Sequence, residues 1–253
     1  MLCLPGLALT SRTFDLIGEG VGGPGVNVVA LDPRGRGKSD VTGPGTYGWD
    51  HHARDVLDAA SALGAKTFDV IGHSLGAYAA LQAIRFEPTR VRRLVLLDTV
   101  GLPRYAAVHA IIDAFDRLSA VFDSADAFVA TARATGIVVP WNDCWDRAFR
   151  SNLENGAGCV RQRASPGAVL EDVEYELRHD QRRLWHDVRI PVLVVRAAVP
   201  LAPPEGFMVP ESDLERFLRL TPSARAVTVE ANHVGVVAHP DTVRAIRAFV
   251  SET

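Results

Sequence analysis

Residues 68–86 read FDVIGHSLGAYAALQAIRF and combine two structural signals around one short motif. Phe68–Ile71 is a short segment typical of a strand, and Leu75–Phe86 is an alanine-rich helical pattern that ends before Pro88. Between them lies Gly72-His73-Ser74-Leu75-Gly76, which is G-x-S-x-G. A serine at a sharp strand-to-helix turn exposes its hydroxyl, and the flanking glycines remove side chains that would collide there. The pentapeptide also occurs by chance, but the strand before it and the helix after it favour Ser74 as a nucleophile.

The alternation of strand-like and helix-like segments extends outward from this motif. It is typical of an α/β fold with a mostly parallel, doubly wound sheet that has helices on both faces. The expected strands are Leu2–Leu4, Val26–Leu31, Phe68–Ile71, Val91–Leu97, Val192–Val195 and Ala226–Val229. The expected helices of this part are Ser11–Glu19, Asp50–Leu63, Leu75–Phe86, Ser212–Leu220 and Pro240–Val250.

The middle of the chain has a different pattern. From Arg104 to about Trp185 we find no convincing buried strand, but helical patterns at Ala106–Leu118, Ala125–Ala134, Trp141–Leu153 and Val169–Leu184. We therefore predict a core domain made of residues 1–103 and 186–253, with a helical lid, residues 104–185, inserted between two strands.

Composition limits the classes of partner. The chain has 253 residues, 23% of them charged, and a net charge of -3, which gives no electrostatic reason to expect nucleic acid or an anionic membrane as partner. No apolar stretch approaches the roughly 20 residues of a membrane span. The three cysteines have no metal-binding spacing and are odd in number, so we expect no metal, no disulfide framework and a cytoplasmic location.

The motif has companions that together define a resemblance. Residues 32–39 read DPRGRGKS after the expected strand Val26–Leu31, and Asn232-His233 follows the last strand. With Gly72–Gly76, these stretches make the chain resemble the α/β-hydrolase superfamily, and in particular its lid-bearing esterase, lactonase and C–C hydrolase branch. The resemblance implies that the basic loop braces the floor of an active site and that no cofactor is needed. It also implies an antiparallel edge hairpin before Leu2, so either the protein has lost that edge or its translation start lies further upstream. An uncovered edge strand favours association, so a homodimer is one expectation.

Histidine is the natural base for a serine nucleophile, because its pKa lies near neutrality. The resemblance implies His233 as this base, since it stands after the last strand and before the final helix. We interpret His73 as packing beneath the serine turn, and His239 as structural. His109 is a weaker candidate for the cleft.

The acid of the expected triad is not in its usual place. The resemblance puts an aspartate a few residues after Val195, but residues 196–201 read RAAVPL. Asp98, directly after the strand Val91–Leu97, is the favoured substitute, because ligand chemistry gathers at the carboxyl ends of parallel strands. Glu205 and the absence of any acid are the alternatives.

Two backbone N–H groups are expected to bind a developing oxyanion. The Leu75 N–H lies at the start of the helix after Ser74, where free N–H groups and the helix dipole favour negative charge. The resemblance implies the Leu7 N–H as the second donor, within Pro5-Gly6-Leu7.

We therefore predict a serine hydrolase that cleaves a carboxylic ester, lactone or similar acyl bond of a small, partly apolar substrate through an acyl-enzyme. C–C bond hydrolysis or a lyase reaction on the same triad is one alternative, and a non-catalytic protein that binds a small ligand is another. The lid aromatics Tyr105, Phe115, Phe122, Phe128, Trp141 and Trp145 suggest an apolar pocket wall, although aromatics at helical spacing more often form a core.

Overall fold

The computed structural model describes residues 1–101, 118–203 and 206–252. The predicted lid helix Ala106–Leu118 and the alternative acid Glu205 therefore lie outside the described residues, apart from Leu118 itself.

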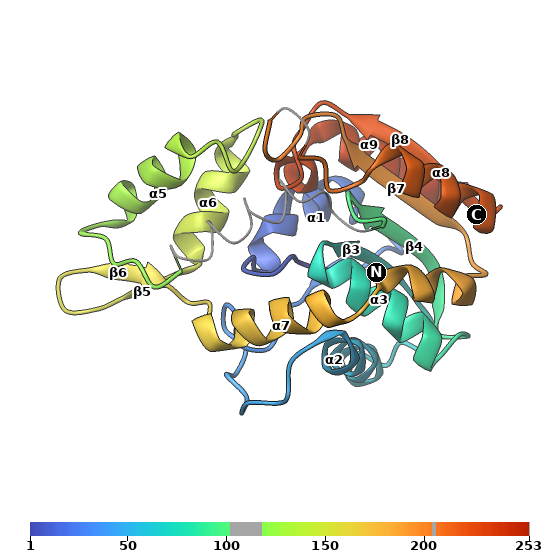
Figure 1. Cartoon of the computed structure of the whole chain (residues 1–253), viewed down its shortest axis with the longest axis horizontal. Coiled ribbons are helices and arrows are strands. Elements are labelled where there is room, and N and C mark those ends of the chain that lie inside the picture. Colours follow the sequence, from blue (N-terminus) through green and yellow to red (C-terminus); the bar gives the residue numbers. More distant parts are fainter. Residues whose placement is uncertain (102–117, 204–205, 253) are drawn as a thin grey trace.

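A parallel sheet forms the centre of the described chain (Figure 1). Its strand order is β2-β1-β3-β4-β7-β8, and every neighbouring pair is parallel. The strands are β1 (Leu2–Leu4), β2 (Val29–Ala30), β3 (Phe68–His73), β4 (Val91–Leu97), β7 (Val192–Ala197) and β8 (Ala224–Val229). The predicted α/β class is confirmed, although the second strand is much shorter than the expected Val26–Leu31.

Both faces of the sheet are apolar, because helices cover both. Along β4, Leu94 and Leu96 belong to one core cluster, whereas Val95 and Leu97 belong to the other. The first cluster packs under α2 (Trp49–Ala62), α3 (Leu75–Phe86) and α8 (Glu211–Leu220), and the second under α1 (Asp15–Val21) and α9 (Pro240–Ser251). Successive strand residues point to opposite faces, so a continuous apolar run indicates a doubly covered strand.

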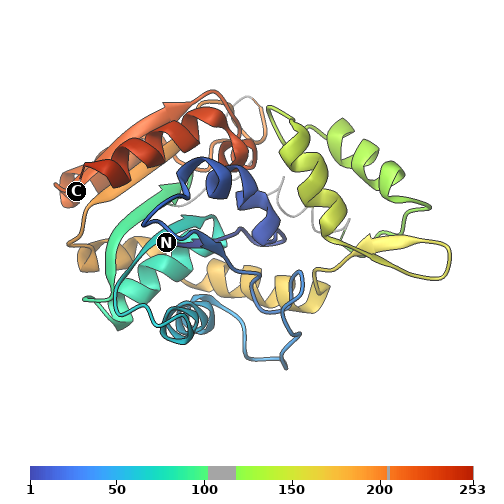
Figure 2. The same cartoon turned by 180° about the vertical axis from the view of Figure 1, so that it is seen from behind.

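The segment between β4 and β7 carries α5 (Ala125–Ala134), α6 (Asp143–Ser151), α7 (Pro166–Arg178) and the 3₁₀ helix η2 (Gln181–Asp187). Figures 1 and 2 show α5 and α6 beside the sheet, on the side away from the C-terminus. In the same views α7 lies next to α2 and α3. The predicted helix Val169–Leu184 is instead two helices, because α7 ends at Arg178 and His179 has an extended backbone.

An antiparallel hairpin in this segment was missed. Its strands β5 (Leu153–Asn155) and β6 (Val160–Gln162) pair with each other and not with the central sheet. Both are short and partly exposed, so they lack the apolar run on which the strand predictions depended. Among the described helices, none has the length and apolar character that crossing a membrane requires.

Candidate active site

Ser74 lies between β3 and α3 in the conformation that the motif predicts. Its backbone has φ 51° and ψ -121°, a left-handed φ that side chains rarely adopt. Glycine is required on both sides of this turn. A Cβ on Gly72 would lie 2.5 Å from Ala77 Cα, and one on Gly76 would lie 2.1 Å from the Leu4 carbonyl oxygen. The close approach of α3 to β1 and β3 therefore depends on the two glycines of the motif.

Thr99 holds the serine turn from below. The Ser74 N–H donates to Thr99 Oγ1 at 2.8 Å, and this hydroxyl donates to the Leu97 carbonyl oxygen at 2.8 Å. Ser74 Oγ, in contrast, forms no hydrogen bond to His233 or to any other described residue, although the serine lines a cavity. A nucleophile needs such freedom, and catalytic hydrogen bonds often form only when substrate is bound. Sequence reasoning missed Thr99, whose one signal is its place next to Asp98.

Asp98 and His233 are in direct contact. His233 Nδ1 lies 3.0 Å from Asp98 Oδ2, and both side chains are buried. The other carboxylate oxygen, Oδ1, accepts from the Ala197 N–H at 2.9 Å. Asp98 has φ 44° and its own N–H donates to the Val195 carbonyl oxygen at 2.7 Å, so the backbone at the ends of β4 and β7 aims the carboxylate at His233. The geometry supports Asp98 as the partner of this histidine.

The carboxylates that follow β7 in the chain are not so placed. Glu205 lies outside the described residues. Glu211 forms an ion pair with Arg196, and Asp213 stands at the start of α8 beside Gly101. Among the described carboxylates, Asp98 is the one in hydrogen-bond contact with His233.

His73 supports His233 from behind. His73 Nε2 donates to the His233 carbonyl oxygen at 2.8 Å, and the two ring centroids are 4.5 Å apart. Burial and the neighbouring His233 hold the pKa of His73 well below its ordinary value, so the ring is neutral. His73 is buried, as expected, and its hydrogen bond positions the backbone of His233.

Asn232 ties the histidine loop to the inserted segment. Its Oδ1 accepts from the Val139 N–H at 3.0 Å and from the Gly235 N–H at 2.9 Å. Its backbone N–H donates to the Val139 carbonyl oxygen at 2.7 Å. Since Asn232 is buried, these bonds couple the position of His233 to residues 136–139.

The two predicted oxyanion donors are free. Neither the Leu7 nor the Leu75 backbone N–H donates a hydrogen bond within the part of the chain that the structure describes. Leu75 is the first residue of α3, and Leu7 follows β1 in the turn closed by the Leu9 N–H and the Gly6 carbonyl oxygen at 3.1 Å. Leu7 and Ser74 line the same cavity. Unpaired N–H groups at this position are available to an oxyanion.

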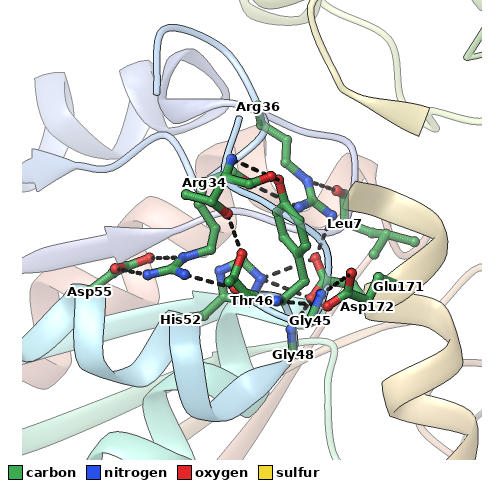
Figure 3. A network of polar contacts seen from close by, with 12 residues as sticks. Leu7, Arg34, Arg36, Gly45, Thr46, Gly48, His52, Asp55, Glu171 and Asp172 are labelled. Carbon is green, nitrogen blue, oxygen red and sulfur yellow. Dashed lines mark hydrogen bonds and ion pairs between the residues drawn. The ribbon is translucent and has the colours of Figure 1, made fainter. Parts of the chain in front are cut away.

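Arg36, in the basic loop 32–39, fixes the turn that carries Leu7 (Figure 3). Its side chain is fully buried, its Nε donates to the Leu7 carbonyl oxygen at 2.8 Å, and one terminal nitrogen donates to the Arg34 carbonyl oxygen at 3.0 Å. The other terminal nitrogen pairs with Asp172 of α7 at 2.6 Å. The prediction that this loop is structural is confirmed, and its link to the inserted segment was not visible in the sequence.

Asp172 joins three segments at this point (Figure 3). Besides Arg36, it accepts from the Gly48 N–H at 2.6 Å and contacts His52 Nε2 at 3.0 Å. Burial by itself would raise the pKa of Asp172, but His52, Arg36 and the Gly48 N–H outweigh it and lower the pKa below its ordinary value. Asp172 is therefore a buried carboxylate that holds α7 against the loop behind Leu7.

A cavity of about 610 Å³ lies above Ser74 and His233. Its wall is mainly apolar, and of the predicted aromatics Phe122 and Phe128 line it. Trp145 is instead buried in the core around α1 and α9, and Trp141 stacks on Phe149. Tyr105, Phe115 and His109 lie outside the described residues.

The wall also contains polar residues that sequence reasoning missed: Trp49, Tyr78, Glu176 and Gln181. No described set of three His, Cys, Asp or Glu side chains converges so as to hold a metal ion.

Comparison with known proteins agrees with this architecture. A family model described as alpha/beta hydrolase fold matches residues 1–240, so the chain belongs to the alpha/beta hydrolase fold family. The chain is 28% identical over 228 residues to 2-(acetamidomethylene)succinate hydrolase of Mesorhizobium japonicum, which is 88% of this chain and 77% of that protein. A serine hydrolase-like protein of Dictyostelium discoideum is 35% identical over 107 residues, which cover 40% of this chain and only 29% of that protein.

A solved structure of E-2-(acetamidomethylene)succinate hydrolase has a TM-score of 0.87 and 26% identity, covering 99% of this chain and 91% of that one. The family and these relatives make the protein an enzyme of the hydrolase class.

Proposed function

We propose that the protein is a serine hydrolase that cleaves a carboxylic ester, lactone or similar acyl bond of a small, partly apolar substrate through an acyl-enzyme. The observation that carries the proposal is the buried contact between Asp98 and His233, at the cavity into which Ser74 presents a free hydroxyl. A structural serine or histidine would have no need of this combination.

In the first half-reaction, His233 Nε2 accepts the proton of Ser74 Oγ while the oxygen attacks the substrate carbonyl carbon. Asp98 keeps the hydrogen on His233 Nδ1, so Nε2 is the basic nitrogen, and it stabilises the imidazolium that forms. The Leu7 and Leu75 N–H groups bind the oxyanion of the tetrahedral intermediate. His233 then returns its proton to the leaving group as the carbonyl–oxygen bond of the substrate breaks.

In the second half-reaction, water takes the place of the leaving group. His233 accepts a proton from this water, whose oxygen attacks the acyl-enzyme, and the proton passes to Ser74 Oγ as the acid product leaves. The amount of Ser74 hydroxyl and neutral His233 is the same before and after the cycle. Every group in these steps belongs to the chain, the substrate or water.

A fluorophosphonate probe tests the proposal directly, because it labels a serine that is activated by a histidine. We expect labelling of the wild-type protein and of a variant with a distant serine removed, Ser223→Ala, and none of Ser74→Ala. Wild-type labelling that persists in Ser74→Ala would assign the nucleophile to another residue. No labelling and no turnover of 4-nitrophenyl esters by a folded wild-type protein would contradict the proposal and favour a protein that binds a small ligand.

The bond that is cleaved is tested by the choice of substrate. Turnover of vinylogous diketones with Ser74 required, but not of 4-nitrophenyl esters, would replace the acyl hydrolase by a C–C bond hydrolase or lyase on the same site. We further propose a cytoplasmic location, from the odd number of cysteines, and a homodimer through the edge strand β2. Sedimentation velocity tests the second of these.

A further inference from the structure

The wall of the cavity contains polar atoms that the proposed chemistry does not use. Trp49 Nε1, Glu176 Oε1 and both amide atoms of Gln181 are buried and have no hydrogen-bond partner among the described residues. All of these residues line the cavity, and Trp49 and Gln181 are each only 1% exposed. Buried polar groups are normally paired, and an unpaired one costs about 1–3 kcal/mol. So many unpaired atoms on the wall of one cavity indicate a site for a ligand.

These side chains come from three segments that meet at one place. Trp49 begins α2, Glu176 lies on the last turn of α7, and Gln181 begins η2. The Trp49 ring lies 6.0 Å from the ring of His179, two residues before Gln181, and the Trp49 side chain is close enough to the Glu176 carboxyl to lower its pKa. Trp49 therefore packs against residues close to both Glu176 and Gln181 in the chain.

The cluster also lies close to the reactive centre. Trp49 packs against Tyr78 of α3, with ring centroids 4.9 Å apart. Burial raises the pKa of Tyr78 well above its ordinary value, and both Glu176 and Asp98 add to this rise. Tyr78 is thus within electrostatic range of the polar cluster on one side and of the acid paired with His233 on the other.

Charge narrows the choice of ligand. Of the other charged residues in the described wall, Arg178 pairs with Glu174 at 3.0 Å and Asp180 with Arg182 at 2.7 Å. Arg36 forms an ion pair with Asp172, and Asp172 lies one turn before Glu176 on α7. Burial, and then Asp172, raise the pKa of Glu176 to about 8, so near neutral pH the carboxyl is mostly uncharged. The described wall offers no unpaired cation to a substrate carboxylate.

The inventory of donors and acceptors selects the ligand group. The unpaired atoms are two donors, Trp49 Nε1–H and Gln181 Nε2–H, and two acceptors, Gln181 Oε1 and Glu176 Oε1, the hydrogen of the uncharged Glu176 carboxyl being on its other oxygen. A carboxylate would pair only with the donors, and an ammonium group only with the acceptors. A neutral carboxamide has both, because its N–H groups donate and its carbonyl oxygen accepts.

We propose that Trp49, Glu176 and Gln181 form a subsite that binds a neutral carboxamide group of the substrate. The amide N–H groups donate to Glu176 Oε1 and Gln181 Oε1, and the amide carbonyl oxygen accepts from Trp49 Nε1 and Gln181 Nε2. This inference rests on the proposed function for the role of Ser74 and adds the class of substrate to it: small acyl compounds that carry a carboxamide.

The test measures binding, so it does not depend on turnover. In Ser74→Ala, calorimetric titration compares four probes of similar length: pentanamide, pentanoate, pentylammonium and hexan-2-one, which can only accept. We expect pentanamide to bind at least about 10-fold tighter than each of the others, since every other probe leaves buried donors or acceptors unpaired. Equal affinities, or tightest binding of pentanoate or pentylammonium, would overturn the subsite.

Variants then locate the preference. Gln181→Leu and Glu176→Leu should each reduce the preference for pentanamide over hexan-2-one by roughly 10-fold. Gln162→Leu is the matched control, because Gln162 lines the same cavity from β6 and is not part of the cluster. Loss of the preference in Gln162→Leu, or its survival in both other variants, would contradict the assignment. Fluorophosphonate labelling of the wild type tests the proposed function separately, so either idea can fail without the other.

Discussion

Replacing Asp172 by asparagine tests how strongly α7 is held against the loop behind Leu7. Asp172 and Arg36 are both 0% exposed, and their side chains are 2.6 Å apart. Asp172→Asn keeps the size of the side chain and an oxygen for the Gly48 N–H, but it leaves the Arg36 guanidinium buried without its counter-ion. Removing one partner of a buried ion pair costs about 3–5 kcal/mol. For a chain of this length, each kcal/mol lowers the midpoint of thermal unfolding by about 2–4 °C, so we expect a fall of roughly 6–20 °C.

Circular dichroism at 222 nm, with thermal and urea unfolding, measures this loss. Glu174→Gln is the matched control, since it is also a carboxylate-to-amide change on α7, in a pair with Arg178 whose side chains are 48% and 72% exposed. An exposed pair contributes at most about 1 kcal/mol, so this variant should unfold close to the wild type. The double variant Arg36→Met with Asp172→Asn should be more stable than Asp172→Asn, because no unpaired charge remains buried. An Asp172→Asn protein within 1 kcal/mol of the wild type would refute the reasoning.

Substitutions of Asp98, Arg36 and Glu176 test a catalytic role, a positioning role and the ionisation of a buried carboxyl, respectively. Asp98→Asn turns an acceptor into a donor toward His233 Nδ1 and selects the wrong tautomer, so kcat for 4-nitrophenyl butyrate should fall by about 10⁴-fold with little change in thermal stability; a fall below 10-fold would remove Asp98 from the mechanism. Arg36→Lys should lower kcat per labelled Ser74 by up to about 10²-fold and leave KM within a few-fold, because lysine cannot bind the Leu7 carbonyl oxygen with the same geometry. A parallel rise in KM would argue against a positioning role. For Glu176, burial and Asp172 raise the pKa to about 8 in the folded state, against 4.5 in the unfolded chain. Between these two pH values the folded state binds one more proton than the unfolded state does, so the free energy of unfolding falls as pH rises from 4.5 to about 8. The fall is at most about 1.4 kcal/mol per pH unit. Glu176→Gln removes this loss, and its stability relative to the wild type, from urea unfolding at pH 5, 6.5 and 8, should increase with pH; a difference that does not change with pH would contradict the buried carboxyl.

The residues of the proposed reaction could be selected from the sequence because local signals mark them. Gly72 and Gly76 indicate the turn at Ser74, and His233 follows the last strand. Asp98 required a choice, because its place after Val91–Leu97 is also compatible with a strand cap. The structure supports it through a contact between residues far apart in the chain, His233 Nδ1 to Asp98 Oδ2 at 3.0 Å.

Other parts of the site had no such signal. Thr99, which accepts a hydrogen bond from the Ser74 N–H, has no signal in the sequence beyond its place next to Asp98. Glu176 and Gln181 lie in a helical pattern that looks solvated, and the break between α7 and η2 that turns Gln181 inward is not marked by glycine or proline. The hairpin β5–β6 was missed because short, half-exposed strands lack an apolar run.

The amino-acid sequence by itself determined the periodicity of the strands and helices, and with it the parallel sheet, the serine turn and the histidine after the last strand. These features depend on interactions between near neighbours: apolar alternation, steric limits on φ and ψ, and the room that glycine leaves. Only the tertiary structure decided which carboxylate meets His233, that Arg36 joins Leu7 to Asp172, and that Trp49, Glu176 and Gln181 share one cavity wall. Contacts of this kind are set by how separate segments pack, and burial then gives the charges and unpaired polar atoms an energy that no local pattern contains.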